Sequence, residues 1–141
     1  MTAWARTLTA LSLLAIDPAG LRGALVRARP SPARDRFLDH SKSLFDEHTR
    51  LHPGLNFDDL TGGIDLAASL GAGEIVQRQG LLNGAARLFL LPMAERAEPV
   101  LISTLTEAID ANPEHAVIAL DESGDDGGAV HGALADRLAF E

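Results

Sequence analysis

Apolar positions along the chain follow two spacings, one typical of helices and one typical of buried strands. Apolar residues at helical spacing predict an amphipathic opening helix, which Asp17 and Pro18 end; they are Trp4, Leu8, Leu11 and Ala15. Short apolar runs bounded by turn formers predict buried strands at residues 23–28, 87–91 and 115–120. Further helices are expected over residues 33–48, 65–70, 99–111 and 130–135.

The order of these elements predicts the fold class. Strands that alternate with helices and are apolar on both faces favour a parallel sheet with right-handed crossovers in a single α/β domain. The helix over 99–111 is expected to begin with Pro99 at its first position and to bury Val100, Leu101, Leu105 and Ala108. Residues 51–63 are rich in turn formers and are interpreted as an irregular insertion, with a break at Gly71 and Gly73 and an extended piece over 74–79. A further strand begins at 138–141.

The amino-acid composition excludes several kinds of site and disfavours some classes of function. The 141 residues are 46% hydrophobic, yet no apolar run approaches the roughly 20 residues that span a bilayer, so a cytoplasmic location is expected. The absence of cysteine excludes disulfides, thiolate zinc sites and cysteine nucleophiles. A net charge of −8 and few aromatic residues disfavour nucleic-acid binding. Residues 1–36 nevertheless carry a net charge of +4, which makes this third the better candidate for contact with anions.

The loop after the first predicted strand has the position of a phosphate-binding loop but lacks its residues. Such a loop needs G-x-x-x-x-G-K-[ST], so that backbone N–H groups and a lysine surround phosphate and a hydroxyl binds Mg²⁺. The prolines at 30 and 32 remove two N–H donors, and a carboxylate stands where the hydroxyl is required. The four matching positions, which we interpret as a degenerate site, hold Ala28, Ala33, Arg34 and Asp35.

The second requirement of such ATPases, an Asp-Glu pair at the end of a strand, is also missing. The strand over 87–91 is followed by Pro92 and Met93 instead. Asp121 and Glu122 do follow an apolar run, over 115–120, but no competent phosphate loop precedes them. A solvated acidic loop and a divergent metal-binding pair remain the two interpretations of these residues.

Other sites are not supported by the residue patterns. The acidic loop over 121–132 has Asp126 where a calcium loop needs glycine and Gly132 where it needs glutamate. His48 and His52 are spaced as zinc ligands on a helix, but Pro53 follows and no third ligand is placed nearby. No G-x-S-x-G nucleophile motif occurs. We therefore expect no metal site and no self-contained active site.

Four segments together resemble a known family. They are AIDPAGLRGALVRA, HPGLNFDDLTGGIDLAASLGAGE, QGLLNGAARLFLLPMAER and ALADRLAF, and they are spread over residues 15–140, so that the likeness runs over essentially the whole chain. The succession resembles the N-terminal AAA+-like domain of magnesium chelatase D subunits, with LLPMAER as the most specific piece. The enzyme of that family inserts Mg²⁺ into protoporphyrin IX for chlorophyll and bacteriochlorophyll synthesis.

The resemblance implies a three-layer αβα core of the P-loop NTPase (AAA+) type over residues 1–141, with a degenerate nucleotide site. Family D subunits continue into a helical lid, an acidic proline-rich linker and an integrin-I-like domain, so this chain is expected to be the N-terminal part of a longer subunit. A sensor asparagine is also missing, since no asparagine follows Asn112. Arg137 falls where AAA+ proteins carry the arginine that reaches a neighbour's nucleotide; an ordinary surface arginine beside Asp136 is the other interpretation.

The implied function is a non-catalytic platform in magnesium chelatase. The expected partners are the I-subunit ATPase, which uses ATP and Mg²⁺, further copies of this subunit in a ring, and the porphyrin-binding H subunit. This chain is expected to bind no cofactor of its own. Two alternatives stay open: a divergent ATPase that uses Asp121 and Glu122, and an interaction module unrelated to tetrapyrroles.

Overall fold

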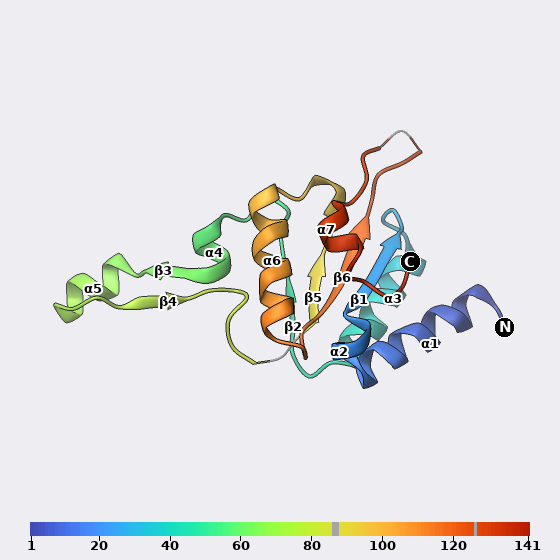
Figure 1. The fold of residues 1–141 in the computed structure, drawn as a ribbon, viewed down its shortest axis with the longest axis horizontal. Helices are drawn as coiled ribbons and strands as arrows, with labels where there is room; N and C mark the ends of the chain where they lie inside the picture. Colours follow the sequence, from blue (N-terminus) through green and yellow to red (C-terminus); the bar gives the residue numbers. More distant parts are fainter. Residues whose placement is uncertain (86–87, 126) are drawn as a thin grey trace.

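Four parallel strands form the centre of the computed structural model, which describes residues 1–85, 88–125 and 127–141 (Figure 1). The sheet has the order β1-β6-β5-β2, and its strands are β1 (Gly23–Arg27), β6 (Ala116–Asp121), β5 (Leu88–Leu91) and β2 (His48–Arg50). Every neighbouring pair is parallel, which confirms the predicted sheet. On the outer side of β1, Phe140 makes a parallel bridge to Ala24, where a further strand was expected.

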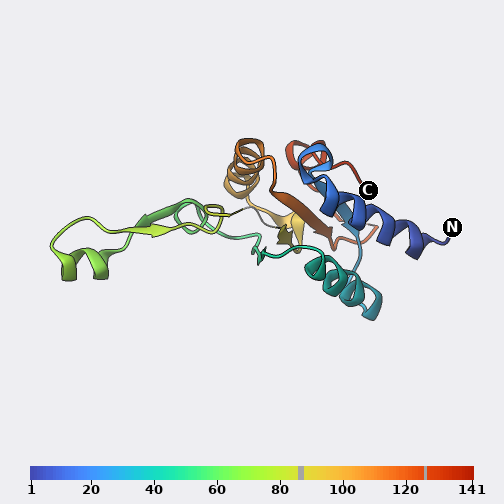
Figure 2. The same ribbon diagram turned by 90° about the horizontal axis from the view of Figure 1, so that it is seen from below.

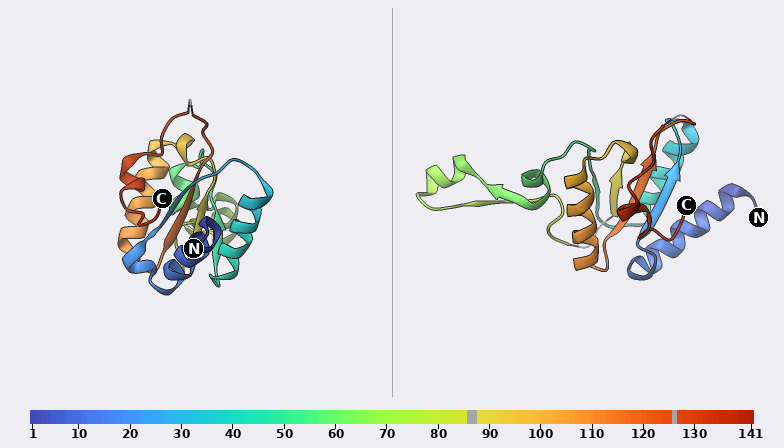
Figure 3. Two further views of the ribbon diagram at one scale, coloured as in Figure 1. Left: turned by 90° about the vertical axis from the view of Figure 1, so that its right-hand side faces the viewer. Right: turned by 45° about the horizontal axis from the view of Figure 1, so that its top comes forward.

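Helices cover both faces of this sheet. The helices α1 (Ala3–Ile16) and α3 (Pro32–Ser43) lie on one face, and α6 (Pro99–Ala111) and α7 (Gly132–Ala135) lie on the other. Successive residues of a strand point to opposite faces, so Leu88 and Leu90 pack with α1 and α3 while Phe89 and Leu91 pack with α6. The end-on view in Figure 3 shows the three layers, and the expected αβα core is confirmed.

The helix over 99–111 has the bounds that its sequence predicts. Pro99 occupies the first turn, where its missing N–H costs nothing. Leu101 and Leu105 are buried as expected, together with Ile109. The expectation for Val100 is wrong, because this side chain is 39% exposed and lies beside the buried face rather than in it.

The predicted helix over 33–48 is too long. It ends at Ser43, and residues 48–50 form the edge strand β2 instead. This strand has the polar sequence His-Thr-Arg and, within the part of the chain that the structure describes, it pairs with β5 alone, so backbone hydrogen bonds rather than a buried apolar face hold it. No hydrophobic pattern could have marked it.

Residues 56–82 form a projecting arm where an irregular insertion was expected. Its elements are α4 (Phe57–Thr61), β3 (Gly62–Ile64), α5 (Leu66–Ala72) and β4 (Gln77–Gln79). Strands β3 and β4 pair antiparallel, and a capping box between Asn56 and Asp59 starts α4. The expected break at Gly73 is confirmed, since Gly73 ends α5 in a left-handed conformation, whereas Gly71 lies within the helix. Figures 1 and 2 show the arm extending away from the sheet.

The arm is fixed at its base by glycines and by core contacts. A Cβ on Gly62, whose φ is +87°, would lie 2.1 Å from the carbonyl oxygen of Arg78, and a Cβ on Gly80 would lie 2.3 Å from the nitrogen of Gly62. Only glycine allows the two strands to approach this closely. Leu60 lies where the chain runs into the arm and Leu82 where it returns, and both side chains are buried in the hydrophobic core. Close strand contacts and core packing therefore fix the base of the arm to the rest of the domain.

Two short helices complete the described chain. Asp17 caps α2 (Pro18–Leu21), which leads from α1 into β1. The 3-10 helix η1 (Ala94–Arg96) follows β5. Within the described residues, no helix is long and apolar enough to cross a membrane.

Candidate functional site

The segment interpreted as a degenerate phosphate loop connects the end of β1 to the start of α3, as its position in the sequence predicts. The N–H of Ala28 donates to the carbonyl oxygen of Asp121, which ties the loop to the neighbouring strand. Ser31 precedes α3, and its hydroxyl accepts a hydrogen bond from the N–H of Arg34 at 3.2 Å. The chain therefore caps this helix with its own side chain, where a phosphate loop would offer N–H groups to a ligand.

Arg34, at the position of the phosphate-loop lysine, is paired within the chain. Its Nη1 donates to Oε1 of Glu122, and the side chains of the two residues are only 11% and 13% exposed. The Arg34 Nε is buried and has no hydrogen-bond partner among the described residues. The charge that would attract a phosphate is thus already neutralised by a carboxylate.

The Asp-Glu position after β5 contributes backbone rather than carboxylates. Met93 has a left-handed backbone with φ of 49°, and its N–H donates to Oε2 of Glu122 at 2.7 Å. The Glu122 N–H in turn donates to the Glu95 carboxylate at 3.0 Å. Glu122 therefore links α3, the end of β5 and the end of β6. Nothing in the sequence marks Glu95 and Glu122 as partners, because they meet only through the fold.

Asp121 also has a local role. It is buried, and its Oδ1 accepts hydrogen bonds from the N–H and the hydroxyl of Ser123. Beside it lies a polar cavity of about 630 Å³, whose lining includes Arg27 and Arg29. The Arg29 guanidinium packs against Gly124, where a Cβ would lie 1.9 Å from its Nη2. Both carboxylates of the open alternative, Asp121 and Glu122, thus have partners within the chain.

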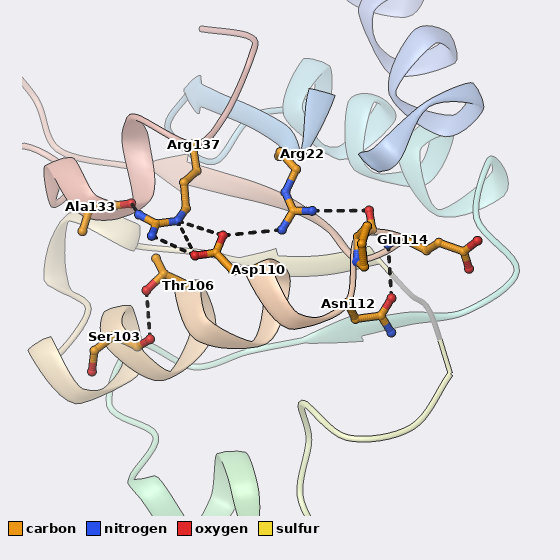
Figure 4. Close-up of polar contacts among 9 residues, drawn as sticks. Arg22, Ser103, Thr106, Asp110, Asn112, Glu114, Ala133 and Arg137 are labelled. Carbon is orange, nitrogen blue, oxygen red and sulfur yellow. Dashed lines mark hydrogen bonds and ion pairs between the residues drawn. The ribbon is translucent and has the colours of Figure 1, made fainter. Parts of the chain in front are cut away.

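Arg137 is held on the opposite helical layer by an ion pair (Figure 4). Its Nε and Nη2 donate to the Asp110 carboxylate at 3.1 and 2.9 Å, and its Nη1 donates to the carbonyl oxygen of Ala133. The hydrogen bonds from Arg137 lower the pKa of Asp110 below its ordinary value, and the same contact raises the pKa of Arg137. Arg22 Nη2 lies 3.8 Å from the same carboxylate. No pattern along the chain marks Asp110 and Arg22 as partners of Arg137.

The histidines singled out as possible ligands are not brought together with others. His48 lies in β2, and His52 Nδ1 accepts a hydrogen bond from the N–H of Gly54. Over 1–85, 88–125 and 127–141, no group of three or more His, Asp or Glu side chains could hold a metal ion. Asp126 of the acidic loop and Arg87 at the start of the predicted strand lie outside the described residues.

The fold has a counterpart among solved structures. A structure of a proposed ATPase from Cytophaga hutchinsonii superposes with a TM-score of 0.63 over 94% of this chain and 47% of that chain. The identity is 17%, so the comparison shows the fold alone. It confirms the predicted α/β fold class. No family model matches the chain.

Two curated proteins match nearly the whole chain in sequence. The magnesium-chelatase 60 kDa subunit of Cereibacter sphaeroides is 47% identical over 137 residues, and that of Rhodobacter capsulatus is 39% identical over 137 residues. The matches cover 97% and 96% of this chain but only 24% of each relative. The predicted resemblance is confirmed: the chain is homologous to the magnesium-chelatase 60 kDa subunit and spans about a quarter of its length.

Proposed function

We propose that the chain is a non-catalytic AAA+ platform of magnesium chelatase, which assembles with an ATPase subunit that drives Mg²⁺ insertion into protoporphyrin IX. Homology to the 60 kDa subunit supports participation in the chelatase. The observation that carries the non-catalytic role is the pairing of Arg34 with Glu122 at the phosphate loop. ATP and Mg²⁺ are used by the partner subunit and not by this chain.

The pairing explains why a nucleotide would bind poorly. A phosphate group would have to displace the Glu122 carboxylate from Arg34 and from the N–H of Met93. It would also meet a loop that lacks two N–H donors and the Mg²⁺-binding hydroxyl. Each lost hydrogen bond costs about 1 kcal/mol, and bonds to charged groups cost more, so the combined loss amounts to several kcal/mol.

Calorimetric titration of the chain with Mg-ATP is therefore expected to show no stoichiometric binding at micromolar concentration. The ATPase subunit, titrated under the same conditions, serves as the positive control. Stoichiometric binding to this chain would contradict the platform role. It would favour an ATPase of its own that uses Asp121 and Glu122.

The proposed partners are the ATPase subunit, further copies of this subunit and the porphyrin-binding subunit. Without its own nucleotide, the domain contributes contact faces to the assembly, and the complex should form most readily when the partner carries nucleotide. Co-migration with the ATPase subunit in size-exclusion chromatography, with and without ATP, tests this. Absence of a complex in both conditions, with both proteins folded, would contradict the proposal.

Arg137 is the one side chain to which we assign a role in the chemistry. Its planar guanidinium would stabilise charge on the γ-phosphate of a neighbouring subunit's ATP. This role requires the guanidinium to leave Asp110, to which it is bonded in the isolated chain. Asp110 would then hold Arg137 until the neighbour's nucleotide competes for it.

A further inference from the structure

The Asp110 carboxylate lies between two arginines, Arg137 on one side and Arg22 on the other (Figure 4). Arg137 donates hydrogen bonds of 2.9 to 3.3 Å to both oxygens of this carboxylate. Arg22 Nη2 lies 3.8 Å from Oδ1, which is close enough for an ion pair but too long for a hydrogen bond. Asp110 therefore has two cationic neighbours and is hydrogen-bonded to one of them.

The Arg22 guanidinium is held near Asp110 and has a donor that is not satisfied. Its Nη1 donates to the carbonyl oxygen of Pro113 at 3.4 Å, whereas its Nη2 is buried and has no hydrogen-bond partner among the described residues. The Arg22 side chain is 16% exposed, while that of Arg137 is 37% exposed. A buried donor without an acceptor is costly, so Arg22 gains more than a solvated arginine would from a hydrogen bond to the carboxylate.

The backbone fixes the position from which the Arg22 side chain starts. Arg22 follows α2, and its N–H donates to the carbonyl oxygen of Pro18 at 2.8 Å, while its own carbonyl oxygen accepts from the N–H of Val117 at 2.9 Å. Its φ of +66° is a conformation that favours glycine over other residues. Backbone strain of this kind collects at functional positions, where the surroundings hold the residue in place. An arginine at such a position favours a use for its guanidinium.

We infer that Arg22 is a positioning residue, which receives the Asp110 carboxylate when Arg137 leaves it. The inference rests on the proposed function in one respect, because the role of Arg137 at a neighbour's nucleotide requires its guanidinium to leave Asp110. A shift of about 1 Å would bring Oδ1 from 3.8 Å to hydrogen-bond distance of Arg22 Nη2.

The transfer of the carboxylate lowers the cost of releasing Arg137. The new hydrogen bond satisfies the buried Nη2 of Arg22 and keeps Asp110 paired with a cation. A carboxylate with Arg137 as its sole partner would be left unpaired by the same movement. Arg22 thus acts through Asp110 and makes Arg137 easier to withdraw toward a neighbouring subunit.

The variant Arg137→Ala tests the transfer in the chain alone, without a partner subunit or nucleotide. Its crystal structure should show Asp110 Oδ1 at about 2.9 Å from Arg22 Nη2. In the unaltered chain, hydrogen bonds from Arg137 lower the pKa of Asp110 most, and the charge of Arg22 lowers it further. NMR titration of the Asp110 carboxyl carbon should show that its pKa stays below the ordinary value in Arg137→Ala. The pKa should return to the ordinary value only in the double variant Arg22→Met with Arg137→Ala.

Two further variants separate loss of charge from damage to the fold. Arg22→Lys with Arg137→Ala keeps a cation beside Asp110 and should hold its pKa below the ordinary value. Arg78→Met is the matched control, because it removes an arginine that pairs with Asp59 on the arm, and it should leave the pKa of Asp110 unchanged. If Arg137→Ala alone returns this pKa to its ordinary value, or leaves the two groups 3.8 Å apart, the inference is overturned.

The assembled chelatase supplies a second readout. If Arg137→Ala lowers the rate of Mg²⁺ insertion, Arg22→Met should lower it about two- to fivefold, since an exposed charge pair contributes about this much. Adding Asp110→Asn should restore the rate, because Arg137 then has no carboxylate to leave. A loss that Asp110→Asn does not restore would indicate a structural role for Arg22 and contradict the inference. An unchanged rate in Arg137→Ala would contradict the proposed role of Arg137, while the transfer measured in the chain alone would stand.

Discussion

Arg137→Ala in the assembled chelatase is expected to lower ATP-dependent Mg²⁺ insertion on the order of 10³-fold, because an arginine that completes a neighbour's phosphate site contributes this much or more to turnover. The fold should be retained, since both Arg137 and Asp110 are well exposed. The measurements are ATPase rate, chelation rate and complex formation. If copies of this subunit instead face one another in their own ring, Arg137 meets a degenerate site and the rates change only by a modest factor.

The variant Asp110→Asn distinguishes two roles of Arg137: action on a neighbour's nucleotide, or a structural ion pair with Asp110. This variant removes the carboxylate that holds Arg137 while leaving the guanidinium in place. If Arg137 acts on a neighbour's nucleotide, Asp110→Asn should keep or raise the rates that Arg137→Ala abolishes. Equal losses for the two variants would indicate a structural pair, and unchanged rates with an unchanged complex would leave Arg137 without a role in the chemistry.

Glu122→Ala is expected to destabilise the chain by about 3 kcal/mol, which corresponds to roughly 10 °C in melting temperature. The substitution leaves the largely buried Arg34 guanidinium without its counter-charge and the N–H of Met93 without its acceptor. Removing one partner of a buried pair costs more than the pair contributes. Thermal and urea unfolding, followed by circular dichroism, measure the change.

Two further variants test the physical reason for this loss. The double variant Arg34→Met with Glu122→Ala should recover much of the stability, because no buried charge remains unpaired. Glu114→Ala, at an exposed glutamate, is the control and should change stability by less than about 0.5 kcal/mol. A loss at Glu122 no larger than at Glu114 would show that the pair does not hold the loop.

The buried strands and the long helix could be predicted from the sequence, since local signals specify them. Residues 88–91 and 116–120 are apolar throughout because both faces of a covered parallel sheet are buried. Pro99 marks the start of α6 because proline suits the first helical turn. The edge strand β2 carried no such signal, because its polar residues are held by backbone bonds on one side alone.

The position of the candidate site could be predicted from the sequence, but the contacts between its side chains could not. The spacing of Ala28 and Arg34 after a strand placed the loop correctly. The pairing of Arg34 with Glu122 could not be foreseen, because the two residues are 88 positions apart and meet only when β6 lies beside β1. Asp110 reaches Arg137 in the same way, across the packing of α6 against α7. Long-range pairs between charges have no periodic signature.

The link from Glu122 to α3 and to the end of β5 has a consequence for motion. A ligand shifts a conformational equilibrium only through a difference in affinity between two states. A repeated cycle of movement also requires the ligand to bind and dissociate. The Glu122 carboxylate is covalently part of the chain, so its effective concentration at Arg34 is fixed. It does not depend on the nucleotide concentration in solution. In the proposed assembly, where this chain binds no nucleotide, any movement driven by ATP would therefore reach the domain from a neighbouring subunit.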